Sequence, residues 1–351
     1  MKTLLPVVCL FSAVAFAQTS IFPLLPPSVS TIPANGDVNP YGVAFVPKTV
    51  PAAGGTLLAG DILVSNFNDS NNLQGTGRTI VRIDKTGQVS LFYTSPLFGL
   101  SAALGVLSNG MVVIGNLPTA DGTSATASRG ALTLLNRNGS LIGTLGSPAT
   151  VDGPWGLTIY DTGNGVSGTA HIFFSNVLSG TIARADVTYG NGVNATVTVI
   201  ASGLSHRGDP AALELGPTGL AYDAIHDVLY FASSTDNAVY SISGALAAQG
   251  VQNATLLFSD LTHLHGPLDL AFLPNGHLLV ANSDGSNVDP NQPSELVEYS
   301  AAGVFLGQMP VDPNNGGAFG LGVNNLGWGI FRLAAVDDNA NSLKIWTSVL
   351  Q

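Results

Sequence analysis

The chain has 351 residues, of which 45% are hydrophobic and only 9% charged, and its formal net charge is −11. This charged fraction is far below the ~25% of ordinary soluble domains, and the 42 glycines and 20 prolines favour strands and turns over helices. The acidic balance, with no run of lysine or arginine, excludes a nucleic-acid partner.

Residues 1–17 have the features of a secretory signal peptide. Lys2 precedes an apolar stretch over residues 4–16, and Ala15 and Ala17 form a small-residue cleavage pattern. The stretch is too short to span a bilayer, and no later segment predicts a membrane span. We therefore expect a secreted protein, extracellular or periplasmic. Cys9, the single cysteine, lies within this segment, so the mature chain has no thiol.

The rest of the chain is built from a repeat. Six segments pair a small residue with a short apolar strand, at residues 40–45, 101–106, 154–159, 217–222, 267–272 and 318–323. Each is followed by a turn, a second apolar strand that ends in a polar residue, and further strands of alternating pattern. Four antiparallel strands, repeated six times, predict an all-β fold, a six-bladed β-propeller over residues 39–351.

The sixth repeat ends after its third strand. Residues 18–38 precede the first repeat, and residues 28–33 are suited to form a strand. We expect this N-terminal strand to be the missing outer strand of the last blade, which would close the ring and cover two open edges.

The opening strands at residues 40–45, 154–159, 217–222 and 267–272 resemble those of six-bladed propellers of the NHL-repeat type, over nearly all of the mature chain. The chain is also distantly similar to gluconolactonase-type propellers. That resemblance implies a fold shared with metal-dependent lactonases and with lyases. Tyr41, Thr218 and Leu268 stand where the lactonase group has Glu, Asn and Asp as metal ligands, so the metal-binding pattern itself differs.

In a propeller, the innermost strand of each blade begins on the face to which the second strand returns. Two rings of residues should therefore surround one mouth of the channel. The inner ring is Gly42, Ala103, Gly156, Gly219, Asp269 and Gly320, and the second ring is Asn66, Asn116, Asn176, Ser233, Asn282 and Asp337. We predict that this face binds a ligand, with Trp155, Arg207, Asn66, Asn176, Asn282 and Asp337 as candidate contacts.

Asp269 is the exception in the inner ring, where the other five residues are glycine or alanine. A carboxylate at this crowded position is suited to hold a cation or to act as a general base. The alternative is a structural aspartate that accepts hydrogen bonds from neighbouring backbone amides.

Three histidines accompany Asp269 near the same face. His263 and His265 alternate along an extended segment just before it, and His206 lies at the preceding blade junction. Together they form a candidate site for zinc or another transition metal, with Asp269 and His265 as candidate catalytic residues. Loop histidines that are simply solvated remain the alternative.

The loop over residues 284–291 is rich in oxygen ligands of the kind that calcium takes, and Asp284 and Asp289 are its candidate ligands. An ordinary polar loop is the other interpretation.

These patterns leave open a purely structural surface component, and they predict two functions. The first is a monomeric binding module that takes a small molecule, a glycan or a protein at the channel mouth. The alternative is a metal-dependent hydrolase or lyase, of lactonase-like type, with its His and Asp ligands at the same face.

Overall fold

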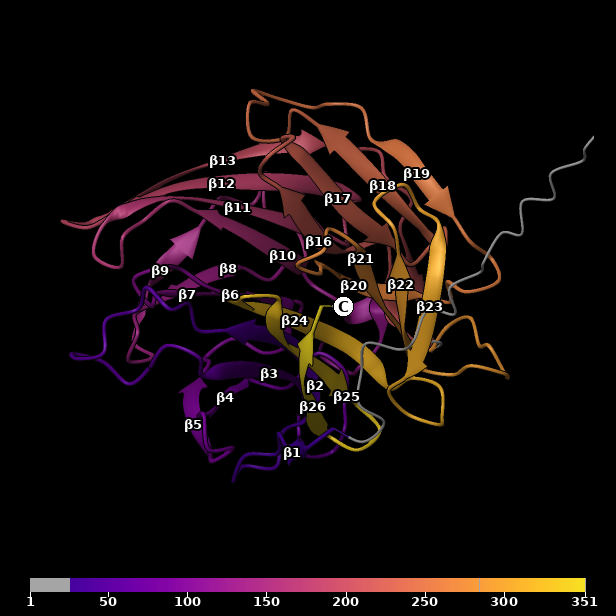
Figure 1. Ribbon diagram of the computed structural model, residues 1–351, viewed down its shortest axis with the longest axis horizontal. Helices are drawn as coiled ribbons and strands as arrows, with labels where there is room; N and C mark the ends of the chain where they lie inside the picture. Colours follow the sequence, from indigo (N-terminus) through magenta and orange to yellow (C-terminus); the bar gives the residue numbers. More distant parts are fainter. Residues whose placement is uncertain (1–25, 284, 351) are drawn as a thin grey trace, which may run out of the picture.

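The computed structural model describes residues 26–283 and 285–350. Six four-stranded antiparallel sheets are arranged in a ring (Figure 1). The predicted all-β, six-bladed propeller is therefore confirmed. The predicted signal peptide, residues 1–17, lies outside the described residues.

The first three blades follow each other directly in the sequence. The first contains β2 (Val38–Phe45), β3 (Ile62–Asn68), β4 (Thr79–Ile83) and β5 (Val89–Thr94). The second contains β6 (Leu100–Val106), β7 (Val112–Asn116), β8 (Leu132–Leu135) and β9 (Leu141–Leu145). The third contains β10 (Pro154–Asp161), β11 (Gly168–Asn176), β12 (Thr181–Tyr189) and β13 (Val193–Ala201).

The other three blades complete the ring. The fourth contains β16 (Pro217–Asp223), β17 (Val228–Ser233), β18 (Ala238–Ser243) and β19 (Thr255–Ser259). The fifth contains β20 (Pro267–Phe272), β21 (Leu278–Asn282), β22 (Glu295–Tyr299) and β23 (Phe305–Pro310). The sixth contains β24 (Ala318–Gly327), β25 (Ile330–Asp337), β26 (Ser342–Val349) and β1 (Ser28–Ser30).

Two small elements lie outside the blades. A hairpin of β14 (Arg207–Asp209) and β15 (Leu213–Leu215) is inserted between the third and fourth blades. A single 3-10 turn, η1 (Ser124–Thr126), lies in a loop of the second blade. Within the described part of the chain, no helix has the length and apolar character needed to cross a membrane.

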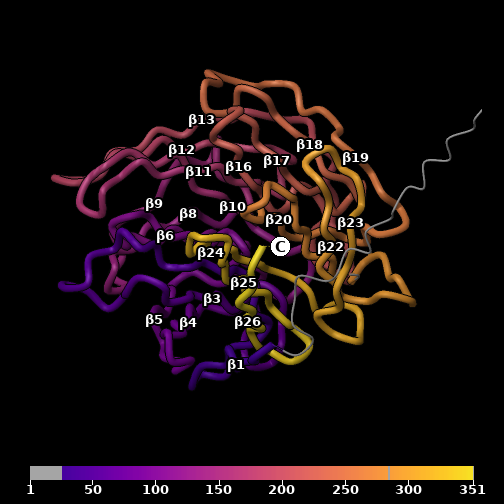
Figure 2. Tube along the Cα trace, in the orientation of Figure 1, coloured from indigo at the N-terminus to yellow at the C-terminus, as the bar shows by residue number. Residues whose placement is uncertain are grey.

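The N-terminal strand closes the ring as predicted. β1 pairs with β26, with Ser28 opposite Lys344 and Ser30 opposite Ser342 (Figure 2). The next residue, Thr31, extends the contact, because its backbone amide and its hydroxyl each donate to the carbonyl of Asn341 at 3.0 Å. The first and last described strands of the chain therefore belong to one sheet, and β1 covers the edge of β26 that would otherwise be open.

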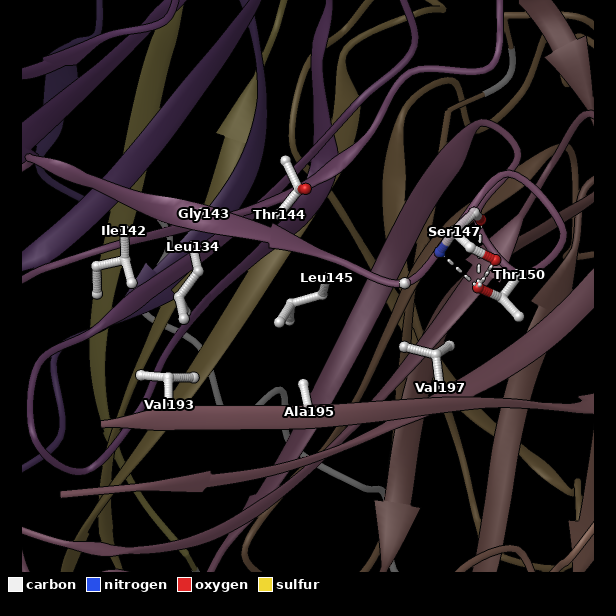
Figure 3. A pocket seen from close by; sticks show the side chains of 11 residues that line it. Leu134, Ile142, Gly143, Thr144, Leu145, Ser147, Thr150, Val193, Ala195 and Val197 are labelled. Carbon is white, nitrogen blue, oxygen red and sulfur yellow. Dashed lines mark hydrogen bonds between the residues drawn. The ribbon is translucent and has the colours of Figure 1, made fainter. Parts of the chain in front are cut away.

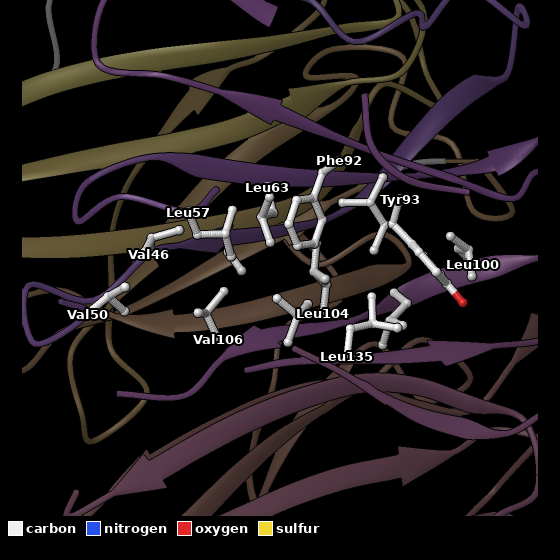
Figure 4. Packing of buried hydrophobic residues seen from close by; sticks show 14 residues of the cluster. Val46, Val50, Leu57, Leu63, Phe92, Tyr93, Leu100, Leu104, Val106 and Leu135 are labelled. Atoms are coloured by element: carbon white, nitrogen blue, oxygen red, sulfur yellow. The ribbon is translucent and has the colours of Figure 1, made fainter. Parts of the chain in front are cut away.

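The apolar core is divided among the blade junctions. Six clusters of buried side chains each lie between two neighbouring blades, and a seventh lies at the axis. At the first junction, Leu63 and Phe92 pack against Leu104 and Val106 (Figure 4). Each such side chain, once buried, stabilises the fold by about 1.5–3 kcal/mol.

The innermost strands of neighbouring blades contact one another around the channel. They approach so closely that a Cβ atom at Gly156 would lie 2.5 Å from the carbonyl oxygen of Thr218. This is why the inner ring is mostly glycine: the next blade occupies the space where a side chain would begin.

Buried hydroxyl groups join neighbouring blades at four junctions. Each donates a hydrogen bond of 2.6 to 2.8 Å to a backbone carbonyl of the next blade. The donor and acceptor pairs are Ser65 with Ser101, Ser101 with Pro154, Ser175 with Thr218, and Thr218 with Pro267.

Candidate functional site

The polar residues of the second ring are buried and hold the loops that join the blades. Asn176 accepts a hydrogen bond from the amide of Asp152 at 2.9 Å and donates to the carbonyl of Thr150 at 3.1 Å. Asn66 donates to the carbonyl of Thr31 at 3.1 Å, which ties the closing segment to the first blade. These two predicted ligand contacts are thus engaged within the fold.

The same holds for the other two ring residues that we predicted as ligand contacts. Asn282 accepts from the amide of His265 at 2.7 Å and donates to the carbonyl of His263 at 3.0 Å. Asp337 is paired with the Lys344 ammonium group at 2.8 Å and is 2% exposed. An Asn side chain at the end of a second strand is therefore suited to hold the loop that leads into the first strand of its blade, and this explains the repeated Asn.

The three candidate histidines do not share a partner. His263 is paired with Asp260 at 2.7 Å and stacks on Phe305 with ring centroids 3.7 Å apart. His265 has its Nε2 atom 4.0 Å from Oδ2 of Asp289, and His206 is exposed in its loop.

Asp284, a candidate calcium ligand, lies outside the described residues. Across residues 26–283 and 285–350, no three His, Cys, Asp or Glu side chains converge as ligands of one metal ion. The predicted zinc set of His206, His263, His265 and Asp269 is not assembled.

The predicted channel mouth is closed by aromatic side chains. Tyr41, Trp155 and Phe319 each precede an inner-ring residue, and they converge at the axis. The ring centroids of Tyr41 and Trp155 are 5.3 Å apart, and those of Tyr41 and Phe319 are 4.6 Å apart. Because Tyr41 and Trp155 come from the first and third blades, their contact crosses the channel. Our prediction that Trp155 is available to a ligand at this mouth is wrong, since its side chain is 0% exposed.

The β14–β15 hairpin covers this closed end. Leu213 adopts a left-handed backbone conformation with φ of 63°, which is unfavourable for a leucine, and its buried side chain joins the axial cluster. The turn of the hairpin also accepts a hydrogen bond, from the Gln74 side chain to the carbonyl of Ala211 at 3.2 Å. Arg207 is exposed on β14, where it pairs with Asp209 at 3.1 Å.

Beyond the inner ring, the channel widens into a cavity of about 250 Å³. Its wall comes from the innermost strands of all six blades and is mainly aliphatic, with Leu104, Leu157 and Leu321 among its residues. Thr158 and Tyr222 follow the inner-ring residues of their strands, whereas the aromatic cluster precedes them. The cavity and the cluster therefore lie on opposite sides of the ring, and the accessible part of the channel is not at the face that we predicted.

Asp269 is the one charged residue among the described residues of the cavity wall. Its Oδ1 accepts a hydrogen bond from the amide of Leu270 and its Oδ2 one from the amide of Leu321, both at 2.8 Å. The second bond joins the fifth blade to the sixth, so the structural interpretation of Asp269 is supported. A Cβ atom at Gly219 would collide with the backbone of Asp269, which leaves no room for a larger residue there.

The environment of Asp269 changes its acid strength. The side chain keeps part of its surface accessible to the cavity, but protein surrounds it. Burial raises the pKa of its carboxyl group from 3.8 to about 7, although the two backbone hydrogen bonds act in the opposite direction. Near neutral pH, this group is therefore suited both to donate a proton and to accept one.

Two further carboxyl groups with a raised pKa were not predicted. Burial and the neighbouring Asp337 raise the pKa of Asp338 to about 8. Burial also raises the pKa of Tyr41, and the negative charge of Asp338 raises it further. Burial and Asp209 raise the pKa of Glu214 to about 7. Asp338 has a signal in the sequence, because it alone is acidic among the residues that directly follow the second-ring residues. These residues are Phe67, Leu117, Val177, Ser234, Ser283 and Asp338.

A larger depression, of about 460 Å³, lies at the outer surface between β9 and β13 (Figure 3). Ile142 and Leu145 face Val193 and Val197 across it. None of the described residues that line it is ionisable, and its polar side chains are the hydroxyl groups of Thr144, Ser147 and Thr150.

Comparisons with known proteins place the fold but give no family. No protein-family model matches the chain, and no curated protein matches it. Among solved structures, a gluconolactonase from Xanthomonas campestris has a TM-score of 0.57 at 12% identity, over 91% of this chain and 89% of the other. A calcium-binding regucalcin from Agrobacterium tumefaciens has a TM-score of 0.56 at 14% identity, over 93% and 97%.

A virginiamycin B lyase from Staphylococcus aureus has a TM-score of 0.51 at 15% identity, over 93% of this chain and 88% of the other. At these identities, the likeness shows a shared six-bladed propeller fold. The predicted resemblance to gluconolactonase-type propellers is thus confirmed for the fold.

Proposed function

We propose that this protein is a binding protein that holds a small molecule in the cavity of its central channel, with Asp269 as the polar contact. The observation that carries the proposal is the position of Asp269, the one charged residue of the described wall, in a cavity whose other side chains are mainly aliphatic. Ligand sites in proteins are typically concave and apolar, with a few placed polar groups.

The main support for a functional role of Asp269 comes from a comparison of the blade junctions. Four other junctions are joined by a serine or threonine hydroxyl group, so a carboxyl group is not required to link two blades. Burying a carboxylate costs free energy unless it is fully compensated, and the pKa of about 7 indicates that the two amides do not compensate it. A group kept at such a cost, in contact with a cavity, is a candidate functional group.

The proposal keeps two expectations from the sequence. We propose that the chain is exported, on the basis of residues 1–17, and that it acts as a monomer. The alternative function, a metal-dependent hydrolase or lyase, has no specific observation in its favour among the described residues.

A fragment screen by ligand-observed NMR tests the proposal. The wild type would be compared with Ala271→Leu, which fills the cavity, and with Ala301→Leu, a matched change at an exposed turn. We expect fragments that bind the wild type and Ala301→Leu but are lost from Ala271→Leu. If every fragment that binds does so equally to all three proteins, the channel is not the binding site.

A further inference from the structure

The charge of the cavity wall narrows the class of ligand. Asp269 is the source of negative charge, and no lysine, arginine or histidine is among the described residues of the wall. The formal net charge of the chain, −11, adds to the unfavourable potential for an anion. A ligand with a positive charge is therefore favoured over a neutral one, and a neutral one over an anion.

The remaining hydrogen-bonding capacity of Asp269 points the same way. A carboxylate has about four acceptor positions, and two are taken by the amides of Leu270 and Leu321. Each oxygen thus keeps one position for a donor from the cavity. The carboxylate is therefore suited to bind a ligand with N–H or O–H donors, and its hydrogen bonds are strongest with a charged donor.

Two aromatic rings also belong to the wall of the cavity. Phe272 and Tyr222 belong to the innermost strands of neighbouring blades and both line the cavity. Tyr230 packs edge-on to Phe272 with centroids 5.3 Å apart, and the Tyr222 hydroxyl group donates to Asp227 at 3.0 Å. These contacts hold the two rings in place at the wall, where they add to the apolar surface that a ligand can contact.

A metal ion fits the same wall poorly. Calcium takes six to eight oxygen ligands, whereas the described wall offers Asp269, Thr158 and Tyr222 as side-chain oxygen donors. The many aliphatic side chains instead suit an apolar body attached to the charged group.

We propose that the channel ligand is a small organic amine, whose ammonium group pairs with Asp269 and whose apolar body contacts the aliphatic wall. This inference rests on the proposed function, because it names the ligand class of the same cavity. Binding forms an ion pair and changes no covalent bond.

The pH dependence of binding follows from the acid strength of Asp269. An ammonium ion binds best to the ionised carboxylate, and the pKa of this group is about 7 in the free protein. Tyr222, on β16, is the other titratable group of the described wall, and it stays neutral because burial and Asp227 raise its pKa. Asp223 and Asp227, beside Tyr222, add negative charge. Affinity should therefore rise by up to about tenfold per pH unit below pH 7 and level off above it.

The test uses benzylamine, benzyl alcohol and benzoate as matched probes at about pH 8, with affinities from calorimetry and nuclear Overhauser contacts to the Leu157 and Leu321 methyl groups. We expect benzylamine to bind at least about tenfold more tightly than benzyl alcohol, with contacts to both methyl groups, and benzoate not to bind. Asp269→Asn should lower the affinity for benzylamine to that for benzyl alcohol. Asp338→Asn, which changes a carboxyl group of raised pKa outside the cavity, should leave it unchanged.

The outcomes separate this inference from the proposed function. If benzyl alcohol binds as tightly as benzylamine and contacts the same methyl groups, the cavity binds ligands but not through charge, and the amine proposal is overturned. If benzylamine binds without contacts to the wall, or equally to Asp269→Asn, it binds elsewhere and the proposal is likewise overturned. If no probe and no fragment contacts the wall, the proposed function fails as well. The methyl contacts in the wild type decide the question even if a variant folds poorly.

Discussion

The backbone amide of Leu321, in the sixth blade, donates a hydrogen bond of 2.8 Å to Oδ2 of Asp269 in the fifth. At four other junctions, the connection is made by a neutral hydroxyl group. Asp269 thus combines a structural contact with a partly accessible position in the cavity wall. Because Asp269 has both roles, the ionisation of its carboxyl group affects the stability of the propeller.

The stability of the protein should fall as the pH rises from about 5 to about 8. Asp269, Glu214 and Asp338 have pKa values of about 7, 7 and 8 in the folded state, raised from 3.8 for aspartate and 4.5 for glutamate. Each binds a proton more tightly when folded, so its stabilising contribution is present at low pH and is lost as the pH rises towards the folded-state pKa. We expect a loss of at least about 2 kcal/mol in the free energy of unfolding.

Chemical denaturation across this pH range measures the effect. Asp338→Asn should flatten the curve, because it removes one of the three carboxyl groups with a raised pKa. None of the described residues donates a hydrogen bond to this carboxyl group, so the change breaks no such bond. Carboxyl groups of lowered pKa, such as Asp186 and Asp260, act in the opposite sense and lose their contribution only in stronger acid. A stability that increases from about pH 5 to about pH 8 would contradict this account.

Deleting residues 18–35 should destabilise the whole propeller. The deletion removes β1 and the bonds from Thr31 to Asn341, and so exposes the edge of β26. We expect the melting temperature to fall by about 10 °C or more, with aggregation through the open edge. Deleting residues 18–25 alone keeps β1 and serves as the control. An unchanged melting temperature for the longer deletion would show that β1 does not close the ring.

Thr218→Val tests the hydroxyl groups that join the blades. The Thr218 side chain is 0% exposed and donates to the carbonyl of Pro267 at 2.8 Å. Valine keeps the shape but leaves that carbonyl without this donor, so we expect a loss of about 1–3 kcal/mol in the free energy of unfolding. The matched change Thr144→Val, at an exposed position of β9, should cost much less. Equal effects of the two changes would count against the proposed role of Thr218.

Tryptophan fluorescence can test the closed end of the channel. Trp155 and Trp346 are 0% and 1% exposed, whereas Trp328, at the turn between β24 and β25, is 98% exposed. Iodide should therefore quench the emission of Trp328 alone, and Trp328→Phe should remove the quenchable part. Quenching that persists in Trp328→Phe would show that solvent reaches Trp155 or Trp346.

The sequence was sufficient to predict the blades, because each blade repeats the same local pattern. Alternation predicted the further strands of each blade, such as β4, and the incomplete sixth repeat predicted the closing pair of β1 with β26. The inner ring also aligned correctly, since the crowding that requires Gly156 applies at the same place in most blades.

The side chains around the channel could not be placed in the same way. Trp155 and Tyr41 lie one residue before the ring, and nothing in the spacing shows that they cross the axis and close it. From the sequence, the Asn residues of the second ring fit a role as ligand contacts as well as a role in holding loops. The hydrogen bonds of Asn176 and Asn282 in the structure show that they hold loops. The insertion of β14 and β15 has no counterpart in the other repeats, so the covering role of Leu213 was also missed.

The titration of the Asp269 carboxyl group tests the central claim most directly. It can be followed by carbon NMR of protein labelled at the aspartate carboxyl carbon, with the signal assigned from its absence in Asp269→Asn. We predict a midpoint near pH 7 in the free protein, as burial requires, and a decrease of at least about one unit when benzylamine is bound. A midpoint near the ordinary aspartate value, or one that does not move when the amine binds, would contradict the assignment of Asp269 as the ligand-binding group of the channel.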